Sequence, residues 1–256
     1  MKPKISVVVT TFNRSTLLKE TINSILNQTF LDFELIIVDN FSDYDFYDLI
    51  NFFEDTRIRA FQNKNHGIIA KNRNYGMSLA MGDFIALCDD DDIWMPTKLA
   101  DQLKIMDRNH KISIISTSFD YFKHANNKSK ISKVQDTLRN YILGLNILPV
   151  KYILLFIPFI ANSSVMIRKN ILNSTGFFNE NPLLVTLEDY DYWFRICQTK
   201  KYFYLNKKLL KYRIHNNQIS NFDKISILKK WKLFFLYNNA SFNVLQKLIF
   251  KLFYKL

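Results

Sequence analysis

The chain has 256 residues, a hydrophobic content of 48%, and a net charge of +12 from 35 basic and 23 acidic side chains. This length and apolar content suffice for a folded core and exclude an intrinsically disordered chain, while five glycines and five prolines exclude collagen-like classes. The positive charge favours an acidic partner, such as nucleic acid, an anionic membrane or a phosphorylated substrate.

Apolar periodicity in the first half alternates between strand-like runs and helix-like stretches. In chain order we expect a strand at Ile5–Thr10, a helix at Leu17–Leu26, strands at Glu34–Val38 and Arg57–Phe61 around a helix at Phe46–Phe53, a helix at Ile68–Ala80, a strand at Phe84–Leu87, a helix at Thr97–Asp107 and a strand at Ile112–Ser116. This alternation predicts βαβ units and an α/β, Rossmann-like fold with a central, mostly parallel sheet.

The pattern weakens after about Asp120. We expect a polar loop at Lys123–Lys133, a strand around Ser164–Ile167, a helix from near Lys169 and another around Tyr190–Gln198. The most apolar stretch, Tyr141–Ile160, is interrupted by glycine, asparagine, proline and lysine. It therefore predicts buried or interfacial segments and no spanning helix.

Cysteine usage and the N-terminal sequence bear on the compartment. Cys88 and Cys197 are far apart and neither belongs to a CxxC pair, so neither a disulfide framework nor a cysteine-rich zinc site is expected. The N-terminal apolar run is too short for a signal-peptide core. We therefore expect a cytoplasmic protein.

Polar side chains follow three of the expected strands. These strand ends are Thr10–Arg14, Val38–Asn40 and Cys88–Asp92. Ligands of open α/β sheets bind beyond the carboxyl ends of the strands, so the three ends are expected to share one site.

The four aspartates at 89–92 are the sharpest feature of the sequence. Adjacent carboxylates repel one another and raise one another's pKa, and a divalent cation such as Mg²⁺ or Mn²⁺ would resolve this conflict. The alternative is a solvated acidic turn that caps the helix beginning near Thr97.

Seven ordered segments carry a resemblance to a known family. They are VVVTTFNR, FELIIVDN, GIIAKNRNYGMSLAMGDFIALCDDDDIWMP, NSSVMIRKNIL, GFF, LEDYDYWFRI and YRIHNNQIS. Together they resemble glycosyltransferase family 2, with the GT-A fold, over about Lys4–Ser220. The resemblance implies a domain at 1–222, with a nucleotide-binding half (about 1–118) and an acceptor-binding half (about 119–222).

The resemblance also implies how the donor is held. Thr10 and Phe12 match the motif that holds the nucleotide base, where an aromatic face can stack on a pyrimidine. Asp39 matches the aspartate that accepts from the base N–H, which favours uracil and so a UDP-sugar. Arg73 matches a basic residue near the base and pyrophosphate, and Arg14 completes the expected nucleotide-binding set.

The resemblance also implies which residues would bind the metal and the ribose and which would catalyse the transfer. Asp91 would ligate Mn²⁺ or Mg²⁺ at the diphosphate, while Asp89 or Asp90 would hold the ribose hydroxyls. His215 matches a histidine facing the diphosphate or metal. Asp189 matches the catalytic base, which would take the acceptor proton and give inversion. We expect Asp189 and the aspartate cluster to converge in space.

Each assignment has a structural alternative. Phe12 would then be a core residue, Arg73 a cation on a helix surface, and His215 a surface or hydrogen-bonded histidine. The acidic residues around Asp189 would complement a helix dipole.

Two residues depart from the family pattern, and one sequence element of processive synthases is absent. Asn40 stands where a second acidic residue is common, and Cys88 replaces an aliphatic residue, as a small hydrophobe. The sequence has no QxxRW element, which argues against a processive synthase. We expect transfer of a single sugar in cell-surface polysaccharide synthesis, such as lipopolysaccharide O-antigen or capsule.

The C-terminal segment, 223–256, combines lysines with apolar residues. Phe242, Leu245, Ile249, Leu252 and Leu256 fall at helical spacing beside Lys247, Lys251 and Lys255, and Lys229, Lys230 and Lys232 flank Trp231 and Phe234–Phe235. These basic amphipathic helices predict contact with the anionic inner face of the cell membrane, where a lipid-linked or glycan acceptor would lie. The alternative is a helix that packs on the domain.

Two other classes are weighed against a glycosyltransferase. A sugar nucleotidyltransferase would carry a glycine-rich loop after the first strand, whereas this chain has TTFNRS there. A nucleic-acid-binding protein would have a basic stripe beside stacking aromatics, and the clearest basic cluster is instead the C-terminal one. We therefore expect no nucleic-acid partner.

Overall fold

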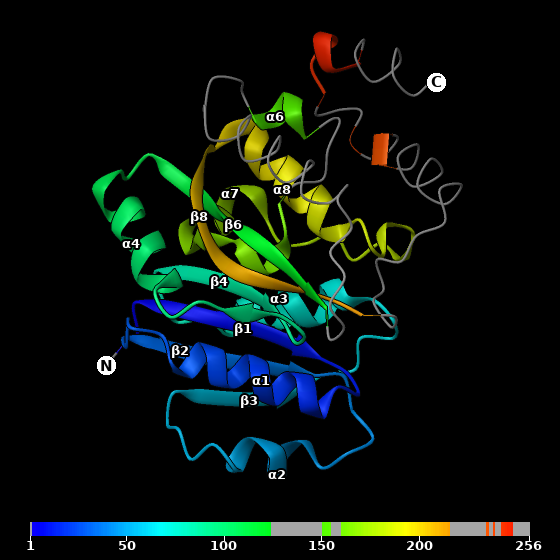
Figure 1. Cartoon of the computed structure of the whole chain (residues 1–256). Coiled ribbons are helices and arrows are strands. Elements are labelled where there is room, and N and C mark those ends of the chain that lie inside the picture. The colour runs from blue at the N-terminus through cyan, green and yellow to red at the C-terminus, as the bar shows by residue number, and fades with distance from the viewer. Residues whose placement is uncertain are drawn as a thin grey trace.

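The computed structural model describes residues 2–123, 150–154, 160–215, 234–235, 238 and 242–247. A mixed sheet forms its centre (Figure 1). The strands are β1 (Ile5–Thr11), β2 (Phe33–Asp39), β3 (Ile58–Gln62), β4 (Phe84–Asp89), β5 (Ile93–Trp94), β6 (Ile112–Lys123), β7 (Met166–Arg168) and β8 (Lys201–Ile214). The helices are α1 (Ser15–Leu26), α2 (Phe46–Asn51), α3 (Ile69–Leu79), α4 (Lys98–Arg108), α6 (Val150–Ile153), α7 (Leu172–Thr175) and α8 (Glu188–Thr199).

The strand order is β3-β2-β1-β4-β7-β6-β8-β5. The four strands β3, β2, β1 and β4 run parallel, as the sequence predicts. Beyond β4 the sheet is mixed, because β7 pairs antiparallel with both β4 and β6, β8 pairs parallel with β6, and β5 pairs antiparallel with β8. The expected boundary near residue 118 falls inside β6.

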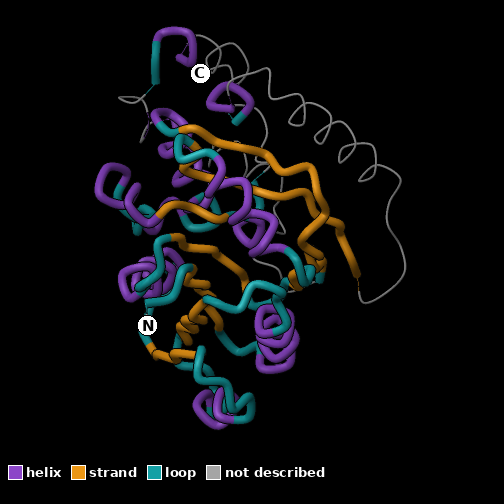
Figure 2. Tube along the Cα trace, turned by 90° about the vertical axis from the view of Figure 1, so that its left-hand side faces the viewer, coloured by secondary structure: helices purple, strands orange, loops and turns teal. Residues whose placement is uncertain are grey.

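Helices cover both faces of the sheet, as the turned view shows (Figure 2). Successive side chains of a strand point to opposite faces. Val7 and Val9 of β1 accordingly pack with α1, α2 and α4, whereas Val8 packs with α3 and α8. The central strands β1 and β2 are buried along their whole length, which explains their continuous apolar, β-branched sequences.

Gly76 lets α3 lie close against the sheet. A Cβ at this position would lie 2.5 Å from Val8 Cγ1 and 3.2 Å from Val38 Cγ2. A larger residue would push this helix away from β1 and β2. The close approach fixes Arg73, one turn earlier on the same helix, at the carboxyl ends of the strands.

The second half departs from the expected elements. Strand β8 was not predicted, because its KYFYLNKKLLKYRI sequence mixes lysines with apolar residues at no regular period. Strand β6 runs on to Lys123, seven residues beyond the expected end at Ser116, and pairs there with β8. Near Ser164 the chain first forms a 3₁₀ turn, η1 (Asn162–Ser164), before β7. The helix expected from Lys169 is a 3₁₀ turn, η2 (Lys169–Ile171), followed by the single turn α7.

Described parts of the C-terminal segment pack on α8. Phe234 is fully buried, with ring centroids 4.8 Å from Tyr190 and 5.1 Å from Phe194, and Phe242 lies 4.9 Å from Phe194. The Asn238 amide donates to Asp191 Oδ1 at 2.8 Å. These aromatic side chains therefore belong to the core, which corrects the assignment of Phe234–Phe235 to an interfacial surface.

The two described residues of the expected apolar stripe, Phe242 and Leu245, differ in exposure. Phe242 is buried, whereas Leu245 is 51% exposed and the neighbouring Val244 is 86% exposed. The remaining residues of both stripes, Lys229–Lys232, Ile249, Lys251, Leu252, Lys255 and Leu256, lie outside the described residues. Among the helices that the structure describes, none combines the length and apolarity needed to cross a bilayer.

Candidate active site

A cavity of about 160 Å³ opens at the carboxyl ends of β1 and β4, against α3 and the start of α8. Its lining contains most of the predicted site residues, namely Thr10, Arg14, Arg73, Asp89, Asp90, Asp91 and Asp189. The expected convergence of Asp91 and Asp189 is therefore found. A larger hollow, about 630 Å³, lies at the opposite edge of the sheet beside Lys4 and Asp83, which pair with each other.

The aspartate cluster is buried, so the interpretation as a solvated acidic turn is wrong. Asp90, Asp91 and Asp92 are 3%, 7% and 1% exposed. Burial raises the pKa of Asp90 to about 6, and the charge of Asp91 raises it as well, whereas Arg14 opposes the shift. Burial and neighbouring carboxylates also hold the pKa of Asp92 well above its usual range.

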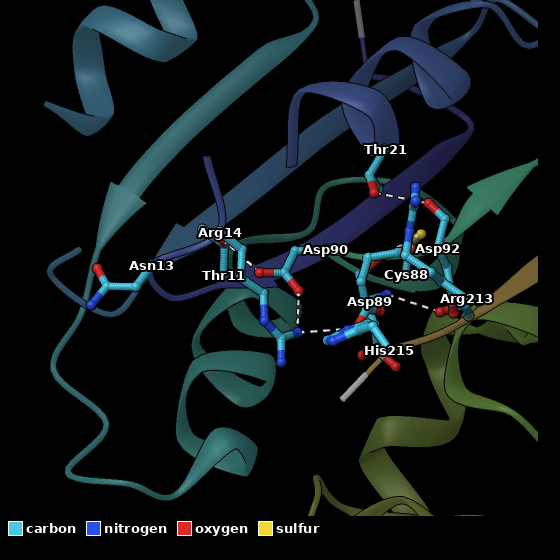
Figure 3. Close-up of polar contacts among 12 residues, drawn as sticks. Thr11, Asn13, Arg14, Thr21, Cys88, Asp89, Asp90, Asp92, Arg213 and His215 are labelled. Carbon is cyan, nitrogen blue, oxygen red and sulfur yellow. Dashed lines mark hydrogen bonds and ion pairs between the residues drawn. The ribbon is translucent and has the colours of Figure 1, made fainter. Parts of the chain in front are cut away.

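The basic side chains of Arg14 and His215 lie beside the aspartate loop (Figure 3). Arg14 Nη1 lies 2.8 Å from Asp90 Oδ1 and 3.0 Å from Asp91 Oδ2. His215 Nε2 lies 2.9 Å from the same Asp91 Oδ2. His215 is therefore a hydrogen-bonded histidine, as the structural alternative allows, and its partner belongs to the acidic cluster.

Strand β8 holds the aspartate loop in place. The Arg213 backbone N–H donates to Asp92 Oδ1 at 2.9 Å, and its Nε donates to the Asp91 carbonyl at 2.7 Å. On the other side, Thr21 Oγ1 of α1 donates to the Asp92 carbonyl at 2.8 Å. Arg213 was missed by the sequence reasoning, although it stands in the quoted YRIH segment two residues before His215.

Arg73 links the aspartate cluster to α8. Its Nη2 donates to Asp89 Oδ1 at 2.9 Å and its Nη1 donates to Glu188 Oε1 at 2.7 Å. Asp89 Oδ1 also accepts from Asn162 Nδ2 at 2.8 Å. Arg73 is buried, so the interpretation as a surface cation is wrong.

Asp189 is the second residue of α8, follows Glu188 and lines the cavity. Burial raises the pKa of Asp189 to about 7, the charge of Glu188 contributes to the rise, and Arg73 opposes it. A carboxylate with a pKa near neutrality can both accept and release a proton at physiological pH. The first turn of α8 is acidic, as the helix-dipole alternative expects, but Asp189 also lines the cavity.

Of the predicted base-binding residues, Thr10 lines the cavity, whereas Phe12 and Asp39 are not part of its lining. Phe12 is 49% exposed on the loop after β1, so it is no core residue. Asp39 is fully buried; its Oδ1 accepts from Ser42 Oγ and its Oδ2 accepts from Ser42 N and Gln62 Nε2. Thr10 Oγ1 is buried and has no hydrogen-bond partner among the described residues, as expected of a group that awaits a ligand.

Several lining residues were not predicted. They are Gly67, Ile69, Val185, Thr186, Glu188 and Tyr212. Thr186 has φ +77°, which is strained for a β-branched residue, and nothing in its sequence context signals this conformation. Cys88 is buried behind the site, and burial holds its pKa well above the usual range, in agreement with its expected role as a small hydrophobe.

The acidic cluster fits a cation that the substrate helps to hold. The part of the chain that the structure describes contains no group of three or more His, Cys, Asp or Glu side chains arranged as a complete metal site. Asp91 and His215 nevertheless offer an oxygen and a nitrogen 2.9 Å apart. Mg²⁺ is commonly bound by one or two carboxylates, waters and substrate phosphates, so this partial donor set fits.

Sequence comparisons agree with this geometry. Residues 6–176 match Glycosyl transferase family 2. The uncharacterized glycosyltransferase MJ1057 of Methanocaldococcus jannaschii is 31% identical over 245 residues, covering 92% of this chain and 78% of that protein. The Escherichia coli UDP-Glc:alpha-D-GlcNAc-diphosphoundecaprenol beta-1,3-glucosyltransferase WfgD is 27% identical, covering 89% and 83%. The chain spans only 34% and 35% of two relatives from Rickettsia conorii and Rickettsia felis.

Solved structures share the fold. Staphylococcus aureus TarS 1-349 in complex with UDP-GlcNAc superposes with a TM-score of 0.73 at 18% identity, covering 98% of this chain and 71% of that one. The mannosyltransferase PcManGT from Pyrobaculum calidifontis, in complex with GDP-Man and Mn²⁺, gives a TM-score of 0.68 at 14% identity, covering 95% and 66%. By its sequence match and its GT-A fold, the chain belongs to glycosyltransferase family 2 and is a glycosyltransferase.

Proposed function

We propose that this glycosyltransferase moves one sugar from a UDP-sugar to an acceptor hydroxyl, with inversion at the anomeric carbon. The observation that carries the proposal is the shared cavity, in which Asp91 and Asp189 both take part in the lining. Asp91 would bind the cation at the diphosphate, and Asp189 would accept the proton of the acceptor hydroxyl. The two roles need acidic groups on opposite faces of the same sugar.

Asp189 is the proposed catalytic base. The acceptor hydroxyl is a weak nucleophile, so its proton passes to the Asp189 carboxylate as its oxygen attacks the anomeric carbon. The bond from that carbon to the diphosphate oxygen breaks in the same displacement, and the nucleoside diphosphate leaves with the bonding electrons. A pKa of about 7 keeps a useful fraction of Asp189 ionised at neutral pH.

The donor is proposed to lie along the loop after β1. Phe12 would stack on the base, Asp39 would accept from its N–H, and Thr10 Oγ1 would gain the partner it lacks. Asp89 and Asp90 would hold the ribose, with Arg14 and Arg73 near the diphosphate. A uridine donor is supported by the relative whose name includes UDP-Glc and by the TarS structure with UDP-GlcNAc.

A divalent cation, Mn²⁺ or Mg²⁺, is proposed to be held by Asp91 and His215. When bound, it would supply positive charge that stabilises the departing diphosphate. The Mn²⁺ in the PcManGT structure supports this proposal, as does the burial of three adjacent carboxylates in one loop.

The acceptor is proposed to be a lipid-linked glycan at the inner face of the cell membrane. Residues of about 119–222 would bind it, those of about 1–118 would bind the donor, and the lysines of 223–256 would contact anionic lipid. WfgD, whose name contains a diphosphoundecaprenol acceptor, supports such a substrate. The product would enter a surface polysaccharide such as O-antigen or capsule.

The proposal is tested by a screen of nucleotide sugars with Mn²⁺ or Mg²⁺, with released nucleoside diphosphate as the readout. Hydrolysis or transfer with a UDP-sugar would support the proposal. Turnover of another nucleotide sugar alone would contradict the choice of donor. Release that Asp189→Asn leaves unchanged would contradict the assignment of the base.

A further inference from the structure

The four aspartates form one tight turn. The Asp92 N–H donates to the Asp89 carbonyl at 3.3 Å, which closes a turn over residues 89–92. Asp90 and Asp91, the two central residues of this turn, carry buried carboxylates that repel each other. A turn with this composition depends on contacts from neighbouring elements for its shape.

Arg213 of β8 contacts the second half of this turn through its backbone and through its guanidinium (Figure 3). Its N–H donates to Asp92 Oδ1 at 2.9 Å, and its Nε donates to the Asp91 carbonyl at 2.7 Å. The residue is only 1% exposed, and its Cζ lies 4.6 Å from the centroid of the Phe122 ring. A buried guanidinium in this position needs a carboxylate partner, because an unpaired buried charge is costly.

Glu20 of α1 is an ion-pair partner of Arg213. Arg213 Nη2 donates to Glu20 Oε2 at 2.5 Å. The Glu20 side chain is 40% exposed and is not part of the cavity lining. The next residue, Thr21, donates its hydroxyl to the Asp92 carbonyl at 2.8 Å. Helix α1 therefore contacts both the turn and the arginine that holds it.

The pair with Glu20 bears on the direction of the guanidinium. Without Glu20, the buried guanidinium would turn towards another carboxylate. The carboxylates of the turn are close, because Arg213 already contacts Asp91 and Asp92. A guanidinium paired with the Asp91 carboxylate would compete with a cation for the same oxygen atoms. The ion pair would therefore keep this positive charge away from the proposed cation ligand.

We propose that Glu20 and Arg213 are positioning residues for the cation site. Glu20 fixes the guanidinium of Arg213, and Arg213 fixes the turn in the conformation that leaves the Asp91 carboxylate for a divalent cation. This inference rests on the proposed function, since it assumes a cation at Asp91. Neither Glu20 nor Arg213 lines the cavity, so both act through the aspartate loop.

The test measures UDP affinity by calorimetry, once in Mn²⁺ and once in a chelator. Glu20→Ala removes the carboxylate, and it should weaken UDP binding in Mn²⁺ by about tenfold, as is typical when a partner of a metal ligand is lost. The affinity in the chelator should stay at the wild-type value. Glu20→Gln keeps an oxygen acceptor at the same position and should bind UDP in Mn²⁺ within about threefold of the wild type.

Arg213→Lys tests the other half of the pair. An ammonium group lacks the fork with which the guanidinium reaches the Asp91 carbonyl and Glu20 together, so UDP binding in Mn²⁺ should weaken here too. Adding Glu20→Ala to Arg213→Lys should cause no further loss, because the two side chains act as one unit. Glu54→Ala, which removes an exposed glutamate between α2 and β3, is the matched control and should bind UDP as the wild type does.

The inference and the proposed function fail in different ways. Equal losses for Glu20→Ala and Glu20→Gln would assign the effect to net charge, and equal losses in Mn²⁺ and in the chelator would assign it to the fold; either result would overturn the inference. Wild-type affinity of Glu20→Ala in Mn²⁺ would also overturn it and leave the proposed function standing. If Mn²⁺ does not strengthen UDP binding to the wild type, both the proposed cation and the inference are wrong.

Discussion

Arg73 Nη1 donates to Glu188 Oε1 at 2.7 Å, joining the middle of α3 to the first residue of α8. Both side chains are buried. The same guanidinium holds Asp89 at the end of β4, so one side chain fixes α8, and with it Asp189, relative to the aspartate cluster. The planar fork of arginine suits this double contact, whereas a lysine ammonium would not span it in the same way.

Replacing Arg73 should therefore destabilise the fold. Arg73→Ala leaves Glu188 and Asp89 without their shared cation, at an expected cost of about 3–5 kcal/mol in the free energy of unfolding, measured with urea. Lys207→Ala is the control, because Lys207 forms an exposed pair with Asp101 and its loss should cost about 1 kcal/mol or less. Equal effects of the two substitutions would contradict the role of Arg73.

Transfer should depend on pH through Asp189. The base acts when ionised and its pKa is about 7, so kcat/KM should fall as the pH drops below 7. Glu188→Gln removes a charge that raises this pKa and should move the acidic limb to lower pH. A profile that stays flat down to pH 5 would contradict the assignment, as would a limb that Glu188→Gln moves upward.

Nucleotide binding should depend on a divalent cation through Asp91. Asp91→Asn removes a charged oxygen ligand, and His215→Ala removes its neighbouring nitrogen. Either change should weaken UDP binding in Mn²⁺ by roughly tenfold or more, as chelation does in the wild type. Asp83→Asn, at the opposite edge of the sheet, should have no such effect. If chelation weakens UDP binding to Asp91→Asn by the same factor as in the wild type, the cation is bound elsewhere.

Membrane contact should depend on the lysines at 229, 230 and 232. Replacing all three by glutamate should reduce flotation with anionic liposomes, since each basic residue near the surface contributes about 1 kcal/mol. Truncation after Asp223 is a poorer test, because it would also remove Phe234 from the core. Replacing Lys207, Lys208 and Lys211 of β8 together by glutamate is the charge-matched control, because it also reverses three lysines. If the variant with glutamate at 229, 230 and 232 floats with liposomes as well as the wild type does, the proposed membrane contact is wrong.

The sequence predicts the first half well because its central strands β1 and β2 are buried on both faces. Continuous runs such as that of β1 leave little ambiguity, and their polar ends mark the site. The aspartates at 89–92 were recognisable because adjacent carboxylates have no ordinary structural use. Asp189 was identified by the family resemblance, and the structure places it in the same cavity as the aspartates.

The rest of the site depends on contacts that no local pattern records. β8 carries lysines along its exposed positions, which hides the strand, although Arg213 within it holds the aspartate loop. The positive φ values of Thr186 and Phe41 arise where tertiary contacts override the preferences of branched and aromatic residues. Phe234 is part of the core because α8 offers it aromatic neighbours, which its basic sequence surroundings conceal.

The most direct measurement compares Asp189→Asn with the wild type in two assays on the same preparation. Mn²⁺-dependent affinity for UDP should stay within about threefold of the wild type, while sugar transfer should fall by roughly a hundredfold or more, since a positioned base contributes about 10²–10⁴-fold. Near-normal turnover by this variant would show that another group deprotonates the acceptor.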